Sequence, residues 1–481
     1  DCLLYTHRRK MMFTTTKKVV AAGLTALMVC SIVSAKPKLS KEQKELSKTL
    51  DAQFKKAGYK VQKNAKGKVY DFEGMVVRVA DWWSSASGLQ GEESKSPAEE
   101  DGKKFRQYVM MTYNCDIDQF GIGGWGSHPQ TVANFCTTGG DENYVFVIDG
   151  RSISAGLKAN LFYDLSTIKD VNWSDSKWVK SVQDKTTKGS SFYGCRPIAP
   201  EPRGGIFFNK RLLKEANIDP ETIYDLQAAG KWDWDAFEKM LKATTRDIDN
   251  DGVLDTFGMA NLSTEFCHLA VMSNGSAWIG KDSKGKYYSM CGDEKTVEAM
   301  NWATKMCQNY EKPAPEGANW DWMYASFING EVAFQADQEY RVGNIADMRD
   351  DWGFVCFPLG PKGDGKYKTL HDDNTYVIPG CYDKDTAEKI AKIFDLWSDP
   401  TPGYGDDAWK EDYYTRFRDE RAVDETLQYM KDNGVVRFDT LISGLNLGNI
   451  IWNAYPGYKT MQEAVEETAN AFQALIDEAN R

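Results

Sequence analysis

Residues 205–219 read GIFFNKRLLKEANID. We interpret the apolar start of this stretch, residues 205–208, as a short strand. Similar apolar runs predict further strands at 75–80, 144–148, 332–334, 354–357 and 376–378. Helical spacing of apolar residues predicts helices at 104–112, 129–136, 234–241, 386–397 and 461–478, with Asp233 as an N-cap. Strands that alternate with helices indicate an α/β fold built from layers.

The composition excludes several classes of protein. The chain has 481 residues, which favours two or three domains. Its net charge of -11 counts against a nucleic-acid binder, for which a basic domain is typical. The only long apolar run is near the N-terminus, so the chain is not a multi-span membrane protein. The 15 Trp and 23 Tyr exceed what packing normally demands and favour a ligand-binding role.

The first 35 residues have the pattern of an export signal. Residues 1–10 precede Met11-Met12, and we interpret them as an upstream extension. Lys17 and Lys18 precede an apolar run at 19–33, and a small-residue cleavage site follows at 33–35. We therefore expect a periplasmic or other extracytoplasmic protein that starts at Lys36. Lipid attachment at Cys30, or an uncleaved membrane anchor, stays open as an alternative.

Eight of the ten Cys follow this leader. In an exported chain they permit disulfides, although their pairing cannot be read from the sequence, and buried free thiols are the alternative. The chain contains four His and no CxxC motif, so we do not expect a zinc site.

Residues 36–70 form a basic arm. This segment has eleven Lys against three acidic residues, and Leu46, Leu50 and Phe54 recur at helical spacing. We expect one amphipathic helix here. Its role is either that of a solvated spacer or that of a contact with a membrane surface or a partner.

Several motifs, in their order along residues 72–481, resemble one family. Phe192-Tyr193-Gly194 followed by the segment 207–219 is similar to its tyrosine-glycine and aromatic-Asn-Lys motifs. Residues 232–244 resemble its Trp-Asp-x-Phe helix, and residues 327–333 its Phe-x-x-Gly-x-x-Ala signature. Residues 358–361, 387–397 and 460–476 match later segments. The family is that of the extracellular solute-binding proteins of ATP-binding cassette importers, typified by maltose-binding protein. Asn217 replaces a usual Gly, which still suits a helix end that tolerates the left-handed conformation.

The resemblance implies a two-lobe periplasmic-binding-protein fold with a hinge and a ligand cleft between the lobes. We expect one lobe from residues 71–200 and 372–418, and the other from 201–371 and 419–481, with crossovers near 199–204 and 370–373. The implied function is capture of a small carbohydrate for the inner-membrane permease of an importer. We expect a monomer that needs no cofactor, catalyses no reaction and binds no nucleic acid.

Aromatic and charged residues at strand ends are the candidate ligand contacts, because open α/β sheets bind ligands there. Trp rings stack on sugar faces, and carboxylates bind neighbouring hydroxyls. After the strands at 75–80 and 144–148 the candidates are Asp81, Trp82, Trp83, Asp149 and Arg151. The alternatives are that one Trp is core and that Asp149 and Arg151 form a local ion pair.

The resemblance adds candidates near the crossovers and the last helix. Glu201 matches the acidic ligand residue of the family and has Arg203 beside it, while Tyr340 falls where the family often places a stacking aromatic. The remaining candidates are Glu339, Arg341, His371, Asp372, Asp373, Trp452 and Tyr455. A solvated turn at 371–373 and a core role for Trp452 are the alternatives.

Residues 247–255 have the spacing of a calcium loop. Asp247, Asp249 and Asp251 occupy positions 1, 3 and 5, and Val253 and Asp255 occupy positions 7 and 9. Position 12 is Gly258, so the usual bidentate Glu is missing. The loop is therefore either a weak calcium site or an acidic turn without metal.

Three rival functions stay open at this point. An exported glycosidase would use two carboxylates, but no G-x-S-x-G or paired metal-binding His supports an enzyme. A binder of another solute, such as a peptide, polyamine or phosphate ester, and a surface adhesin are the others. Two near matches to a phosphate loop, at 280–287 and 360–367, end in Gly-Lys-Tyr and lack the required Ser or Thr.

Overall fold

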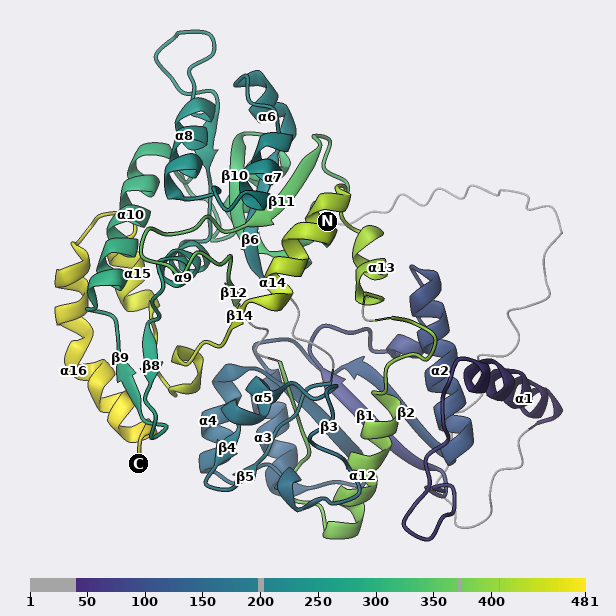
Figure 1. The fold of residues 1–481 in the computed structure, drawn as a ribbon. Helices are drawn as coiled ribbons and strands as arrows, with labels where there is room; N and C mark the ends of the chain where they lie inside the picture. Colours follow the sequence, from purple (N-terminus) through teal and green to yellow (C-terminus); the bar gives the residue numbers. More distant parts are fainter. Residues whose placement is uncertain (1–39, 198–202, 371–373, 406) are drawn as a thin grey trace, which may run out of the picture. The chain divides into compact units, whose positions relative to one another are not determined.

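The computed structural model describes residues 40–197, 203–370, 374–405 and 407–481. Within these ranges the chain forms two four-stranded sheets, each covered by helices (Figure 1). The predicted leader with Cys30, and the candidates Glu201, His371, Asp372 and Asp373, lie outside the described residues. Among the described helices, none combines the length and apolar character that a membrane crossing requires.

The first sheet has the strand order β13-β3-β1-β2. β1 (Met75–Asp81) pairs in parallel with β2 (Cys115–Gly121) and with β3 (Asn143–Ile148), and β13 (Thr375–Val377) joins β3 antiparallel. The carboxyl ends of the three parallel strands therefore share one edge of the sheet.

Both faces of this sheet are covered. Val145 and Val147 of β3 belong to one buried cluster, and Phe146 and Ile148 belong to another. This explains why β3 is a continuous apolar run. The first cluster includes residues of α2 (Pro97–Tyr113) and α12 (Lys384–Trp397), and the second includes residues of α3 (His128–Thr138) and α4 (Gly150–Lys158).

The second sheet has the strand order β11-β6-β10-β7. β10 (Val332–Gln338) pairs antiparallel with β6 (Gly204–Asn209) and in parallel with β7 (Phe257–Met259), and β11 (Trp352–Cys356) closes the other side of β6. Every residue of β6 and β11 is buried. The helices of this unit are α6 (Lys210–Glu215), α7 (Glu221–Ala228), α8 (Trp234–Thr244), α9 (Ser263–Ser273), α10 (Glu294–Tyr310), α11 (Trp322–Ile328), α15 (Gly448–Ala454) and α16 (Met461–Ala479).

Local sequence signals set the ends of several helices. Asp233 caps α8 as predicted, since its Oδ1 accepts a hydrogen bond from the backbone N–H of Ala236 at 2.9 Å. Asn217 has a φ of 57° after α6, the left-handed conformation expected at that position.

The basic arm contributes the helix α1 (Lys41–Lys56), which begins at a capping box on Ser40. Leu50 and Phe54 are buried against α2, and the Phe54 ring lies 5.1 Å from that of Phe105. The prediction of an amphipathic helix is confirmed, but Leu46 of the predicted stripe is 37% exposed.

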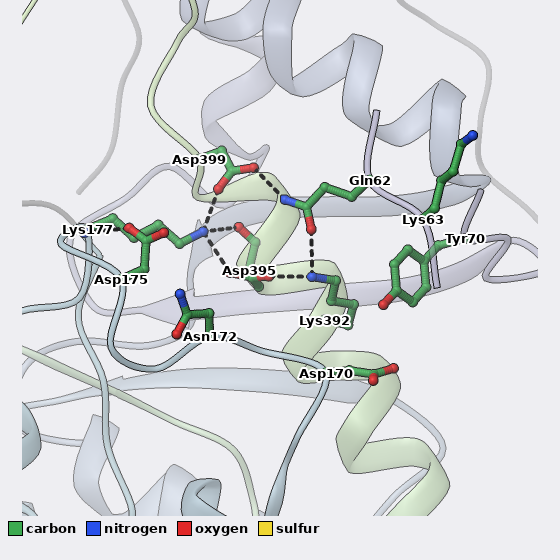
Figure 2. Close-up of a pocket in the computed structure, with 10 residues that line it drawn as sticks. All are labelled: Gln62, Lys63, Tyr70, Asp170, Asn172, Asp175, Lys177, Lys392, Asp395 and Asp399. Carbon is green, nitrogen blue, oxygen red and sulfur yellow. Dashed lines mark hydrogen bonds and ion pairs between the residues drawn. The ribbon is translucent and has the colours of Figure 1, made fainter. Parts of the chain in front are cut away.

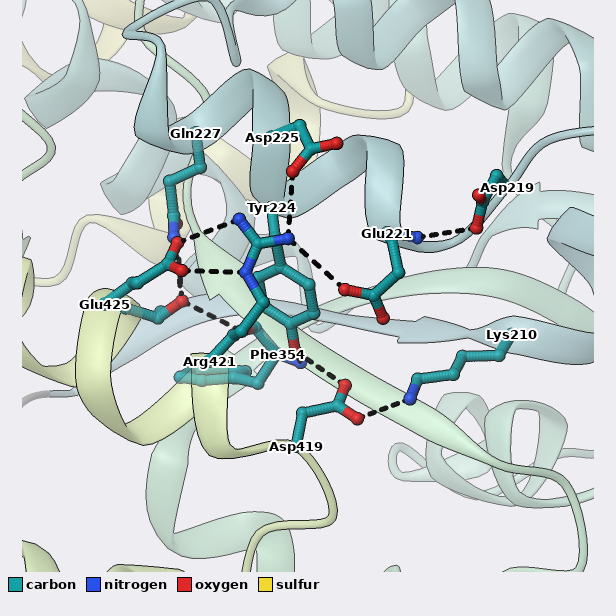
Figure 3. Close-up of polar contacts among 11 residues, drawn as sticks. Lys210, Asp219, Glu221, Tyr224, Asp225, Gln227, Phe354, Asp419, Arg421 and Glu425 are labelled. Atoms are coloured by element: carbon teal, nitrogen blue, oxygen red, sulfur yellow. Dashed lines mark hydrogen bonds and ion pairs between the residues drawn. The ribbon is translucent and has the colours of Figure 1, made fainter.

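Polar contacts fasten the segment after residue 406 to α6 and α7, two helices of the second unit (Figure 3). The Asp419 carboxylate accepts a hydrogen bond from the hydroxyl of Tyr224 in α7 at 2.8 Å and pairs with Lys210. Arg421 donates to Glu425 at 2.7 Å and to Asp225 at 2.9 Å. Charge-assisted bonds of this kind fix the returning chain on α7.

The other elements are short. They are η1 (Leu89–Gly91), η2 (Leu165–Thr167), α5 (Lys180–Lys185), the strand pair β4 (Thr187–Lys188) and β5 (Ser191–Phe192), the hairpin β8 (Ile279–Lys281) and β9 (Tyr287–Ser289), η3 (Glu339–Gly343), the pair β12 (Thr369–Leu370) and β14 (Gly434–Val435), α13 (Trp409–Tyr414), the π-helical η4 (Ala422–Leu427), α14 (Gln428–Asp432) and η5 (Asp439–Leu441).

The six predicted strands overlap β1, β3, β6, β10, β11 and β13, so the α/β class is confirmed. The predictions at 354–357 and 376–378 each run one residue past the end of the observed strand. One detail of the expected lobe assignment differs. Tyr413 and Phe417 are buried in the core of the second sheet, although the sequence assigned 372–418 to the first lobe. The reason is an apolar stripe at helical spacing, Trp409, Tyr413 and Phe417, that packs beside Trp352. All eight Cys of the described residues are free thiols, and six of them are buried.

Candidate functional site

The edge where β1 ends presents two tryptophans. Trp83 is half exposed, and its ring lies 4.9 Å from that of Trp82, which packs against the buried His128 at 5.2 Å. Trp82 also packs against the buried cluster that contains Val145 and Val147. Trp83 is therefore the side chain more available to a ligand.

Asp81 positions this loop from beneath and does not itself reach the surface. Its side chain is fully buried, and Oδ1 accepts the backbone N–H groups of Trp83 at 2.9 Å and Ser84 at 2.8 Å. Oδ2 accepts from the Ser84 hydroxyl at 2.6 Å and from Gln119 at 2.7 Å. The prediction of Asp81 as a direct ligand contact is therefore corrected, because the turn uses its acceptors.

The predicted pair Asp149 and Arg151 begins α4, where Asp149 is the N-cap. Arg151 donates to the Asp149 carboxylate at 2.7 Å, which is the local ion pair left open by the sequence. Its guanidinium also lies 3.5 Å from the ring centre of Trp125, an exposed residue in the glycine-rich loop after β2. The sequence reasoning missed Trp125, although a Trp flanked by glycines after a strand was a usable signal.

The second group of site residues lies where β10 ends. The Tyr340 side chain is 45% exposed, and the guanidinium groups of Arg203 and Arg341 lie 5.1 Å and 5.4 Å from its ring centre. Arg341 also stacks on Tyr324 at 4.3 Å and donates to its hydroxyl at 2.9 Å. Trp320 is exposed beside Tyr324. Arg203, Tyr340 and Arg341, predicted separately, are thus brought together.

Buried carboxylates lie under this aromatic surface. Glu265, Asp337 and Glu339 are each 5% exposed or less. Oε1 of Glu265 and Oδ2 of Asp337 are buried and accept no hydrogen bond from the residues that the structure describes. Arg341 approaches Asp337 at 3.8 Å, too far for a hydrogen bond. Acceptors left in this state are costly unless another group, such as a ligand hydroxyl or water, donates to them.

Burial raises the pKa of Asp337 to about 7, and it also raises the pKa of Glu265. The unfolded chain releases the Asp337 proton near pH 4, whereas the folded chain keeps it until about pH 7. The folded state therefore becomes less stable relative to the unfolded chain as the pH rises between these values. From pH 5 to pH 8 the protein should lose about 2 kcal/mol of unfolding free energy that Asp337→Asn does not lose.

Urea unfolding of both proteins at the two pH values measures this difference. Asp347→Asn, which changes an exposed carboxyl in the same region, is the control and should keep the wild-type pH dependence. Equal pH dependence in wild type and Asp337→Asn would contradict the assignment.

The last two candidates, Trp452 and Tyr455, differ in exposure. Trp452 in α15 is 55% exposed and is available to a ligand. Tyr455 is 3% exposed, and its ring packs 5.8 Å from that of Phe266 in the core of the second sheet. The prediction of Tyr455 as a ligand contact is corrected, because its ring is part of that buried core.

The acidic loop brings three of its four predicted carboxylates together. One oxygen from each of Asp247, Asp249 and Asp255 lies within 4.8 Å of the others. Asp251 instead accepts the backbone N–H of Val253 at 2.7 Å. Two carboxylates also hold the turn, since Asp255 accepts from Ile248 at 2.6 Å and Asp247 from Gly252 at 2.9 Å.

We expect this loop to bind Ca²⁺ weakly or not at all, because position 12 offers no carboxylate. At millimolar affinity and millimolar calcium, the gain by mass action is below about 1 kcal/mol. The melting temperature in excess chelator and in about 1 mM Ca²⁺ should therefore differ by less than about 2 °C. A drop of many degrees on chelation would contradict this expectation.

The model of the family described as bacterial extracellular solute-binding protein matches residues 119–393, more than half of the chain. The chain belongs to this family. No curated protein sequence matches it.

Solved structures resemble this solute-binding protein over most of its length. A cyclo/maltodextrin-binding protein complexed with maltotetraose has a TM-score of 0.59 at 12% identity, covering 84% of this chain and 97% of the other. The sugar-binding protein MalE from Xanthomonas citri has a TM-score of 0.59 at 14% identity, covering 84% and 98%. The GacH receptor of Streptomyces glaucescens has 0.58 at 13% identity, covering 84% and 99%. These likenesses confirm the predicted solute-binding-protein fold.

Proposed function

We propose that the protein captures a carbohydrate outside the cytoplasmic membrane and delivers it to an ATP-binding cassette importer. The observation that carries the proposal is the surface at the end of β10. There Tyr340 and two guanidinium groups lie over buried carboxylates. Aromatic faces suit the C–H faces of a sugar ring, and carboxylate and guanidinium groups suit its hydroxyls.

The edge where β1, β2 and β3 end would supply the opposite wall. Trp83, Trp125 and Arg151 are exposed there and combine the same two kinds of group. Trp452 would add a third aromatic face, and Glu201 and residues 371–373 remain proposed contacts beside the crossovers. The family membership supports the binding of a solute, and the sugar complexes among the similar structures support the choice of carbohydrate.

A thermal-shift screen tests the proposal. Mono- and oligosaccharides are compared with peptides, polyamines and phosphate esters at equal concentration. A ligand at 100 times its Kd raises the unfolding free energy by about 2.7 kcal/mol, so a cognate sugar gives a clear shift. Chromatography of the same samples detects hydrolysis products. A shift with a non-sugar solute alone, or sugar cleavage, would overturn the proposal.

A further inference from the structure

The folded part of the basic arm, residues 40–70, carries a concentrated positive charge. Nine Lys and three acidic residues give it a net charge of +6, in a chain whose total is -11. All nine are exposed, and we call them the lysine surface: Lys41, Lys44, Lys48, Lys55, Lys56, Lys60, Lys63, Lys66 and Lys68.

The lysines of α1 face away from the protein body. Lys41, Lys44 and Lys48 are three and four residues apart, and Lys55 follows seven residues later, so they form one stripe along the helix. Leu50 and Phe54, which pack on α2, lie on the opposite side. The same helix therefore buries its apolar face and presents its lysine stripe to the exterior.

Polar contacts hold the rest of the arm on the first lobe. The hydroxyls of Tyr59 and Tyr113 lie 2.9 Å apart, and the backbone N–H of Gln62 donates to Tyr113 at 2.8 Å. The Gln62 side chain accepts from Lys392 at 2.7 Å and donates to Asp399 at 3.3 Å (Figure 2). The lysine surface is thus a fixed feature of the fold.

Little of this charge is neutralised locally. Within the described ranges, Lys48 pairs with Glu45 at 3.1 Å and Lys55 with Asp51 at 2.8 Å, both on the exposed helix. The same ranges contain no ion pair that involves Lys41, Lys44, Lys56, Lys60, Lys66 or Lys68.

We propose that the lysine surface docks on the anionic phospholipids of a membrane. Residues 40–70 contain no Arg, the residue suited to bidentate recognition of single phosphates. No aromatic residue of this segment is exposed, so it lacks the rings on which nucleic-acid bases stack. Clustered lysines without these groups suit a diffuse sheet of negative headgroups. The docking is independent of the ligand site and needs no sugar.

Vesicle sedimentation tests the proposal. The purified protein is mixed with vesicles of phosphatidylcholine alone and of phosphatidylcholine with phosphatidylglycerol, at about 0.1 M and 1 M NaCl. The leader also contains lysines, Lys17 and Lys18, so the variants described next are needed to assign the binding to the arm. We expect binding to the anionic vesicles that exceeds binding to neutral ones by at least about tenfold and is lost at high salt.

Two matched variants locate the effect. One removes four arm lysines that have no ion pair within the described ranges, by Lys41→Gln, Lys44→Gln, Lys56→Gln and Lys60→Gln. The other makes the same charge change on exposed lysines of the second lobe, by Lys214→Gln, Lys231→Gln, Lys239→Gln and Lys242→Gln. The arm variant should lose at least about tenfold in anionic-vesicle binding, with an unchanged melting temperature, and the control less than about twofold.

Equal binding to neutral and anionic vesicles would overturn the proposal, as would equal losses in the two variants. Binding to a soluble polyanion such as heparin without binding to anionic vesicles would also overturn it. Because these measurements contain no sugar, they stand whether or not the carbohydrate proposal survives its own screen.

Discussion

Replacing Tyr340 by Ala should weaken carbohydrate binding by roughly 5- to 150-fold, which corresponds to about 1–3 kcal/mol. The ring is 45% exposed, and the guanidinium groups of Arg203 and Arg341 lie 5.1 Å and 5.4 Å from its centre. It therefore offers a preformed face at little cost in side-chain entropy. Calorimetry with the sugar that gives the largest thermal shift measures the loss. Unfolding free energy should change by less than about 1 kcal/mol, because a half-exposed ring contributes little to the core.

Tyr288→Ala is the matched control for this experiment. Tyr288 is 47% exposed and lies on the hairpin strand β9, apart from the end of β10. Its removal should leave affinity unchanged. Trp452→Ala provides a second test of the aromatic wall and should weaken binding in the same range as Tyr340→Ala. Wild-type affinity in both Tyr340→Ala and Trp452→Ala, with a large loss of stability, would mean that these rings are core residues.

Part of the fold could be predicted because burial leaves a plain pattern in the sequence. β3 and β6 are apolar runs with cores against both faces, and each was predicted. β2 was missed because it is an edge strand. Its inward residues alternate with Asp116 and Asp118, whose polarity hides the strand among loop residues.

The site was harder to predict because sequence does not show which way a side chain turns at the end of a strand. Asp81 and Trp83 are two residues apart, yet one is fully buried and the other half exposed. The buried acids Glu265 and Asp337 come from a helix and a strand that only the fold brings together. No local pattern marks such a pair, whereas family motifs identified Arg203 and Tyr340 through their order along the chain.

A cavity of about 260 Å³ in the first lobe contains a different kind of charge cluster (Figure 2). Lys177 bonds to Asp395 at 2.7 Å and to Asp399 at 2.6 Å, and its side chain is only 6% exposed. Lys392 bonds to the other oxygen of Asp395 at 2.8 Å. Each buried charge therefore has an opposite charge in contact with it, and the cluster links the loop before α5 to α12.

Replacing Lys177 by Met should lower the unfolding free energy by about 3–5 kcal/mol, because Asp399 and one oxygen of Asp395 lose their cation while remaining buried. Met keeps most of the stem volume, so the loss reports the charge. Lys180→Met is the control, since Lys180 pairs with Asp184 where both side chains are more than half exposed. That pair should contribute about 0–1 kcal/mol.

Urea unfolding of the two variants measures the contrast, and a double variant identifies its cause. Asp395 keeps its pair with Lys392 in Lys177→Met, whereas Asp399 loses its pair. Adding Asp399→Asn removes that unpaired charge, so the double variant should be more stable than Lys177→Met alone. Its recovery would show that the cost of Lys177→Met lies in the carboxylate left behind and not in lost packing. Equal losses in Lys177→Met and Lys180→Met would contradict this, because burial would then make no difference to the strength of the pair.

The arm provides a further readout, since Gln62 contacts both Lys392 and Asp399. Hydrogen exchange along residues 59–63 should therefore rise in Lys177→Met and stay unchanged in Lys180→Met.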